Sequence, residues 1–367
     1  MTKKKSSDFT LLLTVLILVV IGIIMVFSSS HYYALLKMND SYHFLKREFA
    51  WAALGLVGMF VTMNFDYLKY KKIAPVAYVV SIILLILVLT PAGTRLNGAQ
   101  RWINLGPITI MPGEIAKICA IIFAANRLSI KPERMKNFVK GVIPNLMIIG
   151  IYMGLILLQP NMSTAVTIGA IIASMMFVAG MRWLHVAVMG LGGVAMLISL
   201  IIIEPYRMKR LTGFLDPFAD PKGTGYQVIQ SLYALGSGGL FGVGLGKSVQ
   251  KYLYIPEPQN DFIFAIIGEE LGFIGCVTII ILFVLLIWRG IRIAINAPDL
   301  FGCLLATGIT AMVAVQVIIN IAVATSSMPV TGIALPFISW GGTSLSIFMA
   351  AIGILLNISR YSNLDRS

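Results

Sequence analysis

Ten long apolar stretches constrain the fold of this chain more than any other feature. Most of them approach the ~20 apolar residues that an α-helix needs to cross a bilayer. Hydrophobic residues make up 58% of the 367 residues and charged residues 12%, whereas soluble chains average about 45–50% and about 25%. We therefore expect an all-α, polytopic membrane protein with about ten transmembrane helices that form a single domain over residues 1–367. The stretches run approximately over residues 10–29, 49–65, 73–91, 112–128, 142–158, 163–180, 184–203, 262–288, 300–325 and 342–359.

The distribution of Lys and Arg predicts how these helices are oriented. With the N-terminus inside, sixteen Lys and Arg fall in cytoplasmic segments and five in the short outer loops. Because cytoplasmic loops collect basic residues, we expect both termini in the cytoplasm. The formal charge of +13 is then explained by basic residues that collect in cytoplasmic loops and contact anionic lipids. No nucleic-acid partner is expected. The basic and then apolar N-terminus resembles a signal peptide, but no clean cleavage site follows, so we expect an uncleaved first helix.

The segment 204–261, about 58 residues long, is the one sizeable hydrophilic piece and is expected outside, between the seventh and eighth helices. Within it, "GYQVIQSLYALG" has helical spacing of apolar residues and predicts a short helix at the membrane surface. The sequence "GVGLGKS" resembles a nucleotide phosphate loop, but Phe241 stands where that motif requires Gly. Three cysteines inside apolar stretches show no spacing for zinc or for a disulfide framework.

Acids lie unusually close to the start of the eighth stretch, in "IPEPQNDFIFAIIGEELG". Asp261 at its edge is either a helix N-cap or a general base facing a wet cavity. Glu269 and Glu270 lie about 12 Å deeper along the helix, where carboxylates are costly and are candidates for function. The alternative is a structural role, in bonds to polar groups such as Gln316, Asn320 or Arg101.

Further charged residues are expected at the same outer surface as Asp261. Glu114 and Lys117 are spaced i, i+3 and share a helix face. They either neutralise each other or face the same cavity as Asp261. An acid beside several cations suits a diphosphate-linked lipid, whose phosphates the cations would hold. The candidate substrate-binding residues are Arg101, Glu114, Lys117, Lys251 and Glu257, and the candidate catalytic residue is Asp261.

Several long motifs carry a resemblance to a known family. They are "LPFISWGGTS", "YIPEPQNDFIFAIIGEELGFIG", "PYRMKRLTGFLDPFADPKGTGYQVIQSLYALGSGGLFGVGLG" and "RWINLGPITIMPGEIAK". In these motifs, and in their order along nearly the whole chain, the sequence resembles the SEDS family (shape, elongation, division and sporulation), and within it the FtsW- and SpoVE-like branch. It departs from many relatives at Gln259 and Asn260 before the acid, at Trp340, and at Ser326 and Ser327.

The resemblance implies ten helices, cytoplasmic termini and a peptidoglycan glycosyltransferase that polymerises lipid II with inversion. It places the essential acid at Asp261 and lines the cavity with Glu114 and Lys117. It also implies a class B penicillin-binding protein as transpeptidase partner, other divisome or sporulation proteins, and a location in the cell membrane at a septum. No metal-binding residues are identified, although a divalent cation (Mg²⁺ or Mn²⁺) is an option. The rival functions are a lipid II flippase or transporter and a scaffold that recruits the transpeptidase.

Overall fold

The computed structural model describes residues 5–96, 98–106 and 108–362. Within them, ten long helices coincide with the ten predicted stretches, which confirms the fold class. Seven are long and apolar enough to cross a membrane, α6 is a shorter apolar helix, and α2 and α4 contain more charged residues. The ten helices are α1 (Phe9–Met38), α2 (His43–Asn64), α3 (Tyr70–Leu89), α4 (Pro112–Ile130), α5 (Ile143–Leu157), α6 (Met162–Val178), α7 (Trp183–Ile203), α10 (Ile263–Ile295), α11 (Leu300–Ala324) and α12 (Gly342–Ser359).

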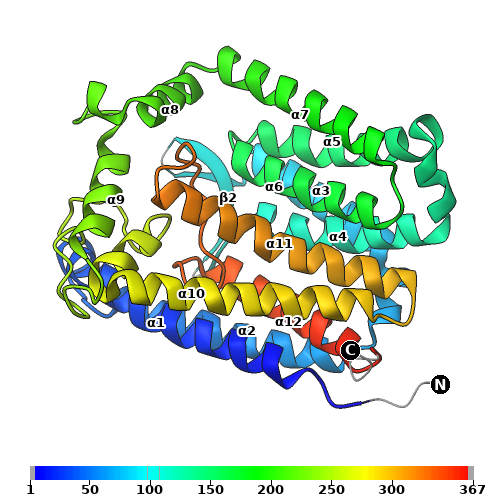
Figure 1. Ribbon diagram of the computed structural model, residues 1–367, viewed down its shortest axis with the longest axis horizontal. Helices are drawn as coiled ribbons and strands as arrows, with labels where there is room; N and C mark the ends of the chain where they lie inside the picture. Colours follow the sequence, from blue (N-terminus) through cyan, green and yellow to red (C-terminus); the bar gives the residue numbers. More distant parts are fainter. Residues whose placement is uncertain (1–4, 97, 107, 363–367) are drawn as a thin grey trace.

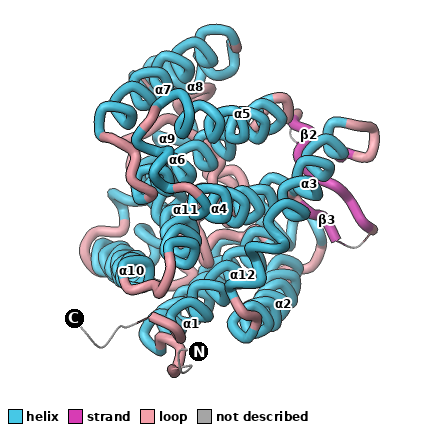
Figure 2. The backbone as a smooth tube through the Cα atoms, turned by 90° about the vertical axis from the view of Figure 1, so that its right-hand side faces the viewer, coloured by secondary structure: helices cyan, strands magenta, loops and turns pink. Residues whose placement is uncertain are grey.

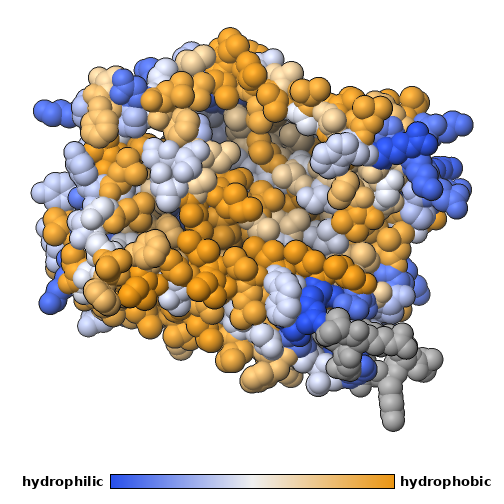
Figure 3. All heavy atoms as spheres, viewed as in Figure 1, coloured by the Kyte–Doolittle hydropathy of each residue, from blue (hydrophilic) through white to orange (hydrophobic). Residues whose placement is uncertain are grey.

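The two ends of the chain lie at the same end of the helix bundle (Figure 1). The backbone N–H of Lys5 donates to the carbonyl of Arg360 at 3.0 Å, and the N–H of Asp8 donates to the hydroxyl of Ser359 at 3.0 Å. Asp8 also pairs with Arg289 of α10. Hydrophobic side chains cover the middle of the visible face and hydrophilic ones gather toward its two ends (Figure 3), as expected for a multi-pass membrane protein.

Close helix packing places α11 and α12 inside the bundle, whereas α7 buries no residue and lies with α8 at the edge (Figure 2). On α12, a methyl group at Gly353 would lie 2.3 Å from the carbonyl oxygen of Met59 on α2. The hydroxyl of Thr62 donates to the carbonyl of Ala350 across the same contact at 2.8 Å. Small residues therefore let the α2 and α12 backbones approach closely, as is common between membrane helices.

A small antiparallel sheet between α3 and α4 was not predicted from the sequence. It consists of β1 (Gly93–Leu96), β2 (Ala99–Leu105) and β3 (Ile108–Ile110) in the order β1-β2-β3. In the register, Thr94 faces Trp102 and Asn104 faces Thr109. The sheet fixes β2, which carries Arg101, near the start of α4.

The segment 204–261 contains two helices, α8 (Pro205–Leu215) and α9 (Tyr226–Ser237), joined through a 3₁₀ turn η4 (Pro217–Ala219). The predicted helix in "GYQVIQSLYALG" is confirmed as α9. Its Ser231 hydroxyl donates to the carbonyl of Ala324 at the end of α11, at 2.7 Å. Short helical turns η1 (Tyr67–Lys69), η2 (Pro132–Lys136) and the π-helical η3 (Phe138–Val142) complete the described elements. The assignment of one domain with an extracellular loop stays a prediction.

Helix α10 is kinked at Gly272, where φ is 67°. The backbone groups that the kink frees are paired with the glycine-rich segment 239–244. Val243 and Gly244 donate to the carbonyls of Glu269 and Glu270 at 2.9 and 3.0 Å, and Phe273 donates to that of Gly239 at 2.9 Å. Glycines in "GVGLGKS" therefore let this segment approach α10 closely enough to pair with the backbone groups that the kink frees. Buried backbone groups normally require such partners.

Replacing Gly272 with Ala is expected to destabilise the protein by several kcal/mol. The new methyl group would meet the backbone nitrogen of Gly242 at 2.3 Å, and the positive φ is strained for any L-residue. Thermal unfolding of the purified protein in detergent measures the loss. Gly150→Ala on α5 is the matched control, since a methyl group there meets nothing within 4 Å. Equal melting temperatures for both variants would contradict the account of the kink.

Candidate active site

Asp261 lies just before α10, at the end of the bundle opposite the chain termini. The N-cap residue of α10 is Phe262, and no side chain caps the helix, so the alternative in which Asp261 is the N-cap is wrong. Among the described residues, no donor hydrogen-bonds to the Asp261 carboxylate, which is half-buried. The carboxylate is therefore available to a ligand.

Burial and charge control the protonation of Asp261. The pKa of its carboxyl is raised from 3.8 to about 6, and removal from water is the largest cause. Within this net shift, the neighbouring carboxylate of Glu257 also raises the pKa, whereas Arg210 and Arg101 lower it. A carboxyl group with a pKa near neutrality is well matched to proton transfer at physiological pH.

The segment between α11 and α12 holds the backbone around Asp261. Asn320 of α11 donates from its amide to the carbonyls of Asp261 and Ile333, at 2.8 and 2.7 Å. The backbone N–H of Trp340 donates to the carbonyl of Gln259 at 2.9 Å. Gly332, with φ of 78°, runs close enough that a methyl group on it would lie 3.4 Å from Asp261 Oδ2.

Unpartnered polar atoms gather in the residues that surround Asp261. Five buried side-chain atoms in these segments have no hydrogen-bond partner within the described part of the chain. Because buried polar groups normally have partners, this concentration indicates a place where water or a polar ligand binds. The five atoms are Gln259 Oε1, Asn260 Oδ1, Asn320 Oδ1, Thr331 Oγ1 and Trp340 Nε1.

Arg101 is brought near Asp261 by the sheet. Its guanidinium donates to the carbonyls of Gln159, at 3.3 Å, and Pro160, which fixes the side chain between β2 and the start of α6. Burial lowers the pKa of Arg101, and the charge of Asp261 raises it. The predicted grouping of Arg101 with Asp261 therefore has a structural basis, and its role in substrate binding stays a prediction.

Arg210 on α8 was missed in the sequence. Its guanidinium donates to the carbonyl of Val330 at 3.0 Å, which ties α8 to the segment that also positions Asp261. Its charge acts on both Asp261 and Arg101. The signal in the sequence was "YRMKR", three basic residues within the long motif 205–246.

Glu257 is held by Asn260, whose amide donates to Glu257 Oε2 at 2.7 Å. Its φ of 46° lies in the left-handed region, so the "PEPQND" turn is strained at this residue. The turn keeps the carboxylate of Glu257 close enough to Asp261 to raise the pKa of that group. Glu257 and Asp261 are close in the sequence, and in the structure the charge of Glu257 acts on the pKa of Asp261.

Glu114 and Lys117 form the predicted pair, with 2.8 Å between Lys117 Nζ and Glu114 Oε2. Lys117 is 1% exposed, its ammonium lies 5.3 Å from the ring centre of Phe348, and Ser344 donates to Glu114 Oε2 at 2.9 Å. The pair therefore links α4 to α12. This arrangement matches the self-neutralising alternative, and a role in substrate binding stays a prediction.

Lys251 forms an ion pair and a hydrogen bond with other residues of the protein. Its ammonium pairs with Glu270 Oε1 at 3.0 Å, and both side chains are 0% exposed. It also donates to the carbonyl of Gly246 at 2.6 Å. Lys251 is thus buried and paired with Glu270, and its predicted role in substrate binding stays a prediction.

Glu269 and Glu270 anchor the loop that precedes Asp261, and the partners suggested from the sequence (Gln316, Asn320, Arg101) are wrong. Glu269 accepts from the Ser248 hydroxyl at 2.5 Å and from the Val249 N–H at 2.8 Å. Glu270 accepts from the Ser28 hydroxyl of α1 at 2.6 Å. Both acids bind the same loop, since Ser248 donates from its hydroxyl to Glu269 and from its backbone N–H to Glu270.

The fold defines a polytopic membrane protein with a polar, charged site at one end of its helix bundle. The chain belongs to the FtsW, RodA and SpoVE family of cell cycle proteins, which it matches over residues 9–364. This confirms the family expected from the motifs.

Individual relatives extend over nearly the whole chain. Stage V sporulation protein E of Bacillus subtilis (strain 168) is 48% identical over 362 residues, which are 98% of this chain and 99% of the relative. A probable peptidoglycan glycosyltransferase FtsW of Trichlorobacter lovleyi is 44% identical, over 89% of this chain and 86% of the relative. A similar solved chain comes from work on the structural coordination of polymerization and crosslinking by a peptidoglycan synthase complex. It superposes on this chain with a TM-score of 0.80 at 31% sequence identity. The superposition covers 96% of this chain and 98% of that chain.

Proposed function

We propose that this protein is a peptidoglycan glycosyltransferase that polymerises lipid II into β-1,4 glycan strands at the outer face of the cell membrane. Relatives named as peptidoglycan glycosyltransferases bear out the enzyme class. The observation that carries the proposal is Asp261, a carboxylate without a hydrogen-bond donor among the described residues, with a pKa of about 6 and with unpartnered polar atoms around it. Sugar hydroxyls supply the partners that those atoms lack.

In the proposed mechanism, Asp261 accepts the proton of the acceptor's GlcNAc 4-hydroxyl. The oxygen attacks the anomeric carbon of the donor's MurNAc, the bond to the diphosphate breaks, and the α-linkage is inverted to β. The diphosphate is a good leaving group, so no second carboxylic acid is required. Arg101 and Arg210, whose charges already act on Asp261, stabilise the negative charge that develops on the diphosphate.

A divalent cation, Mg²⁺ or Mn²⁺, fits the donors at Asp261 and Glu257 if the substrate supplies the remaining ligands. Magnesium in proteins is commonly held by one or two carboxylates and substrate phosphates. Within the described residues, no group of three or more His, Cys, Asp or Glu side chains gathers to hold a metal. When bound, such an ion would offset the charge of the diphosphate.

The proposed orientation places the chain termini in the cytoplasm and Asp261 outside. Its support is the excess of Lys and Arg at the end of the bundle that carries both termini.

The proposed partner is a class B penicillin-binding protein that crosslinks the new strands. Its support is the structural similarity to a synthase complex that couples polymerisation to crosslinking. We place the protein at a division or sporulation septum, where further divisome or sporulation proteins would join it.

Reconstitution tests this function against its two rivals. The full chain, its transpeptidase partner and lipid II in vesicles are expected to yield glycan strands that are visible on gels and cleaved by a muramidase. Movement of labelled lipid II across the bilayer without polymer would support a flippase instead. Recruitment of the transpeptidase with neither polymer nor translocation would support a scaffold.

The pH dependence of polymerisation is expected to follow the protonation of Asp261. The base must be ionised, so kcat/KM should fall as the pH drops through about 6, the pKa of this group. Because Glu257 raises that pKa, Glu257→Gln should move the acid limb to lower pH. Because Arg210 lowers it, Arg210→Gln should move the limb to higher pH. Shifts in the same direction for both variants would contradict Asp261 as the titrating base.

A further inference from the structure

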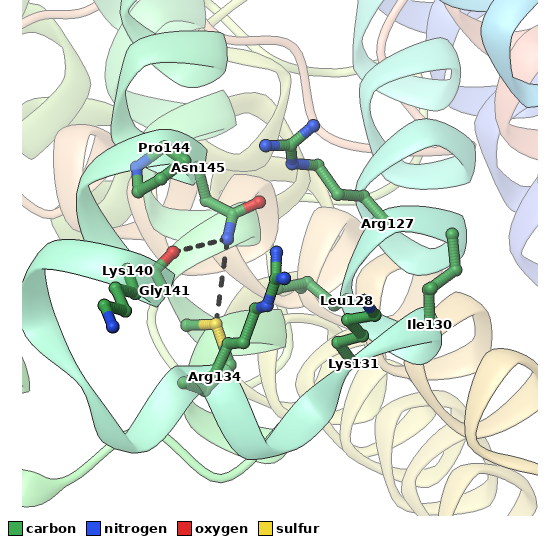
Figure 4. A pocket seen from close by; sticks show the side chains of 10 residues that line it. Arg127, Leu128, Ile130, Lys131, Arg134, Lys140, Gly141, Pro144 and Asn145 are labelled. Carbon is green, nitrogen blue, oxygen red and sulfur yellow. Dashed lines mark hydrogen bonds between the residues drawn. The ribbon is translucent and has the colours of Figure 1, made fainter.

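A basic pocket lies at the end of the bundle opposite Asp261. It has a volume of about 310 Å³ and is formed by the end of α4, the turns η2 and η3, and the start of α5 (Figure 4). Four basic side chains line it, whereas the lining contains no acid. The basic residues are Arg127, Lys131, Arg134 and Lys140.

The polar groups of the pocket converge. Figure 4 shows the guanidinium groups of Arg127 and Arg134 directed toward the amide of Asn145, which in turn donates to the carbonyl of Gly141 at 2.7 Å. No described carboxylate forms a salt bridge with any of the four basic residues. The one acid of the stretch 126–145 is Glu133, which does not line the pocket. The C-terminus of α4 carries about half a negative charge, far less than four cations require.

A small, mostly apolar hollow of about 10 Å³ adjoins the basic pocket between α4, α5 and α6. Arg127 and Asn145 line both, and the hollow adds Phe123, Ile149 and Ile172. Exposed apolar residues lie beside it, with Ile130 and Met147 each 66% exposed. A cationic pocket that opens onto an apolar, membrane-facing surface is complementary to an amphiphile with an anionic head.

We propose that this pocket binds the phosphate headgroup of an anionic glycerophospholipid from the leaflet at this end of the bundle. Arg127 and Arg134 donate to the phosphodiester oxygens, Lys131 and Lys140 add positive charge at the edge, and the acyl chains lie along α5. A soluble phosphate would meet the same arginines but would gain nothing from the exposed apolar residues Ile130 and Met147 beside the pocket. The site is independent of the glycosyl-transfer site.

Photocrosslinking in nanodiscs tests the proposal. The full chain is placed in zwitterionic lipid with a trace of photoactivatable phosphatidylglycerol, and labelled peptides are mapped by mass spectrometry. Labelling is expected within residues 126–147. The double variant Arg127→Gln/Arg134→Gln should lower it roughly tenfold or more, because each basic residue near an anionic headgroup contributes about 1 kcal/mol.

The matched control removes the same charge at the same end but outside the pocket, with Lys72→Gln/Lys136→Gln, and should label as the wild type does. Equal losses in both double variants would overturn the proposal in favour of general surface charge. Suppression by millimolar inorganic phosphate would overturn the lipid as the ligand. If the arginine double variant does not purify as a single species, Arg134→Gln alone replaces it, and unchanged labelling there would also overturn the proposal.

Discussion

Replacing Asp261 with Asn is expected to reduce glycan polymerisation by at least about 100-fold, the usual contribution of a positioned general base. The amide keeps the size of the side chain but cannot accept the proton of the acceptor hydroxyl. Because the carboxylate receives no hydrogen bond from the described residues, the fold should tolerate the change. Strand formation from purified lipid II, with the transpeptidase partner present, measures the loss.

Two measurements make this result specific. The melting temperature of Asp261→Asn should equal or exceed that of the wild type, because an amide avoids the cost of burying a charge beside Glu257. Asp220→Asn, which changes an exposed acid of the segment 204–261, is the control and should retain activity. Full-length glycan from Asp261→Asn would refute the proposed mechanism.

Replacing Glu270 with Ala is expected to destabilise the protein by about 3–5 kcal/mol, since it leaves a buried cation without its partner. Lys251 and Glu270 are both 0% exposed, so water cannot replace the lost carboxylate. Ser28 of α1 loses its acceptor in the same variant. Thermal unfolding in detergent measures the change. Lys46→Ala, which removes an exposed ion pair with Asp40, should have little effect.

The double variant Lys251→Met/Glu270→Gln separates a structural role of Lys251 from substrate binding. Removing both charges is expected to recover most of the lost stability, because neither partner is left alone. If the pair only anchors the loop, polymerisation should recover together with stability. Recovery of stability with a persistent rise in KM for lipid II would instead assign Lys251 to the substrate.

The candidate site was partly readable from the sequence. Asp261 was identifiable because an acid at the edge of a long apolar stretch is conspicuous, and the i, i+3 spacing of Glu114 and Lys117 predicted their contact. Arg210 was not identifiable, because nothing in its local sequence shows that α8 folds back toward the segment between α11 and α12. The partners of Glu269 and Glu270 were also misjudged, since they come from a loop and from α1.

The class of protein, the ten helices and the family could all be predicted from the amino-acid sequence alone. Hydrophobic length is a local property, and the bilayer leaves few folds for it. The fold was needed to show that Lys251 is buried against Glu270 and that the glycine-rich segment pairs with the kinked α10. It was also needed to show that Arg101 and Arg210 act on Asp261. These facts depend on how distant segments pack, and packing places charges within a few ångströms irrespective of their separation along the chain.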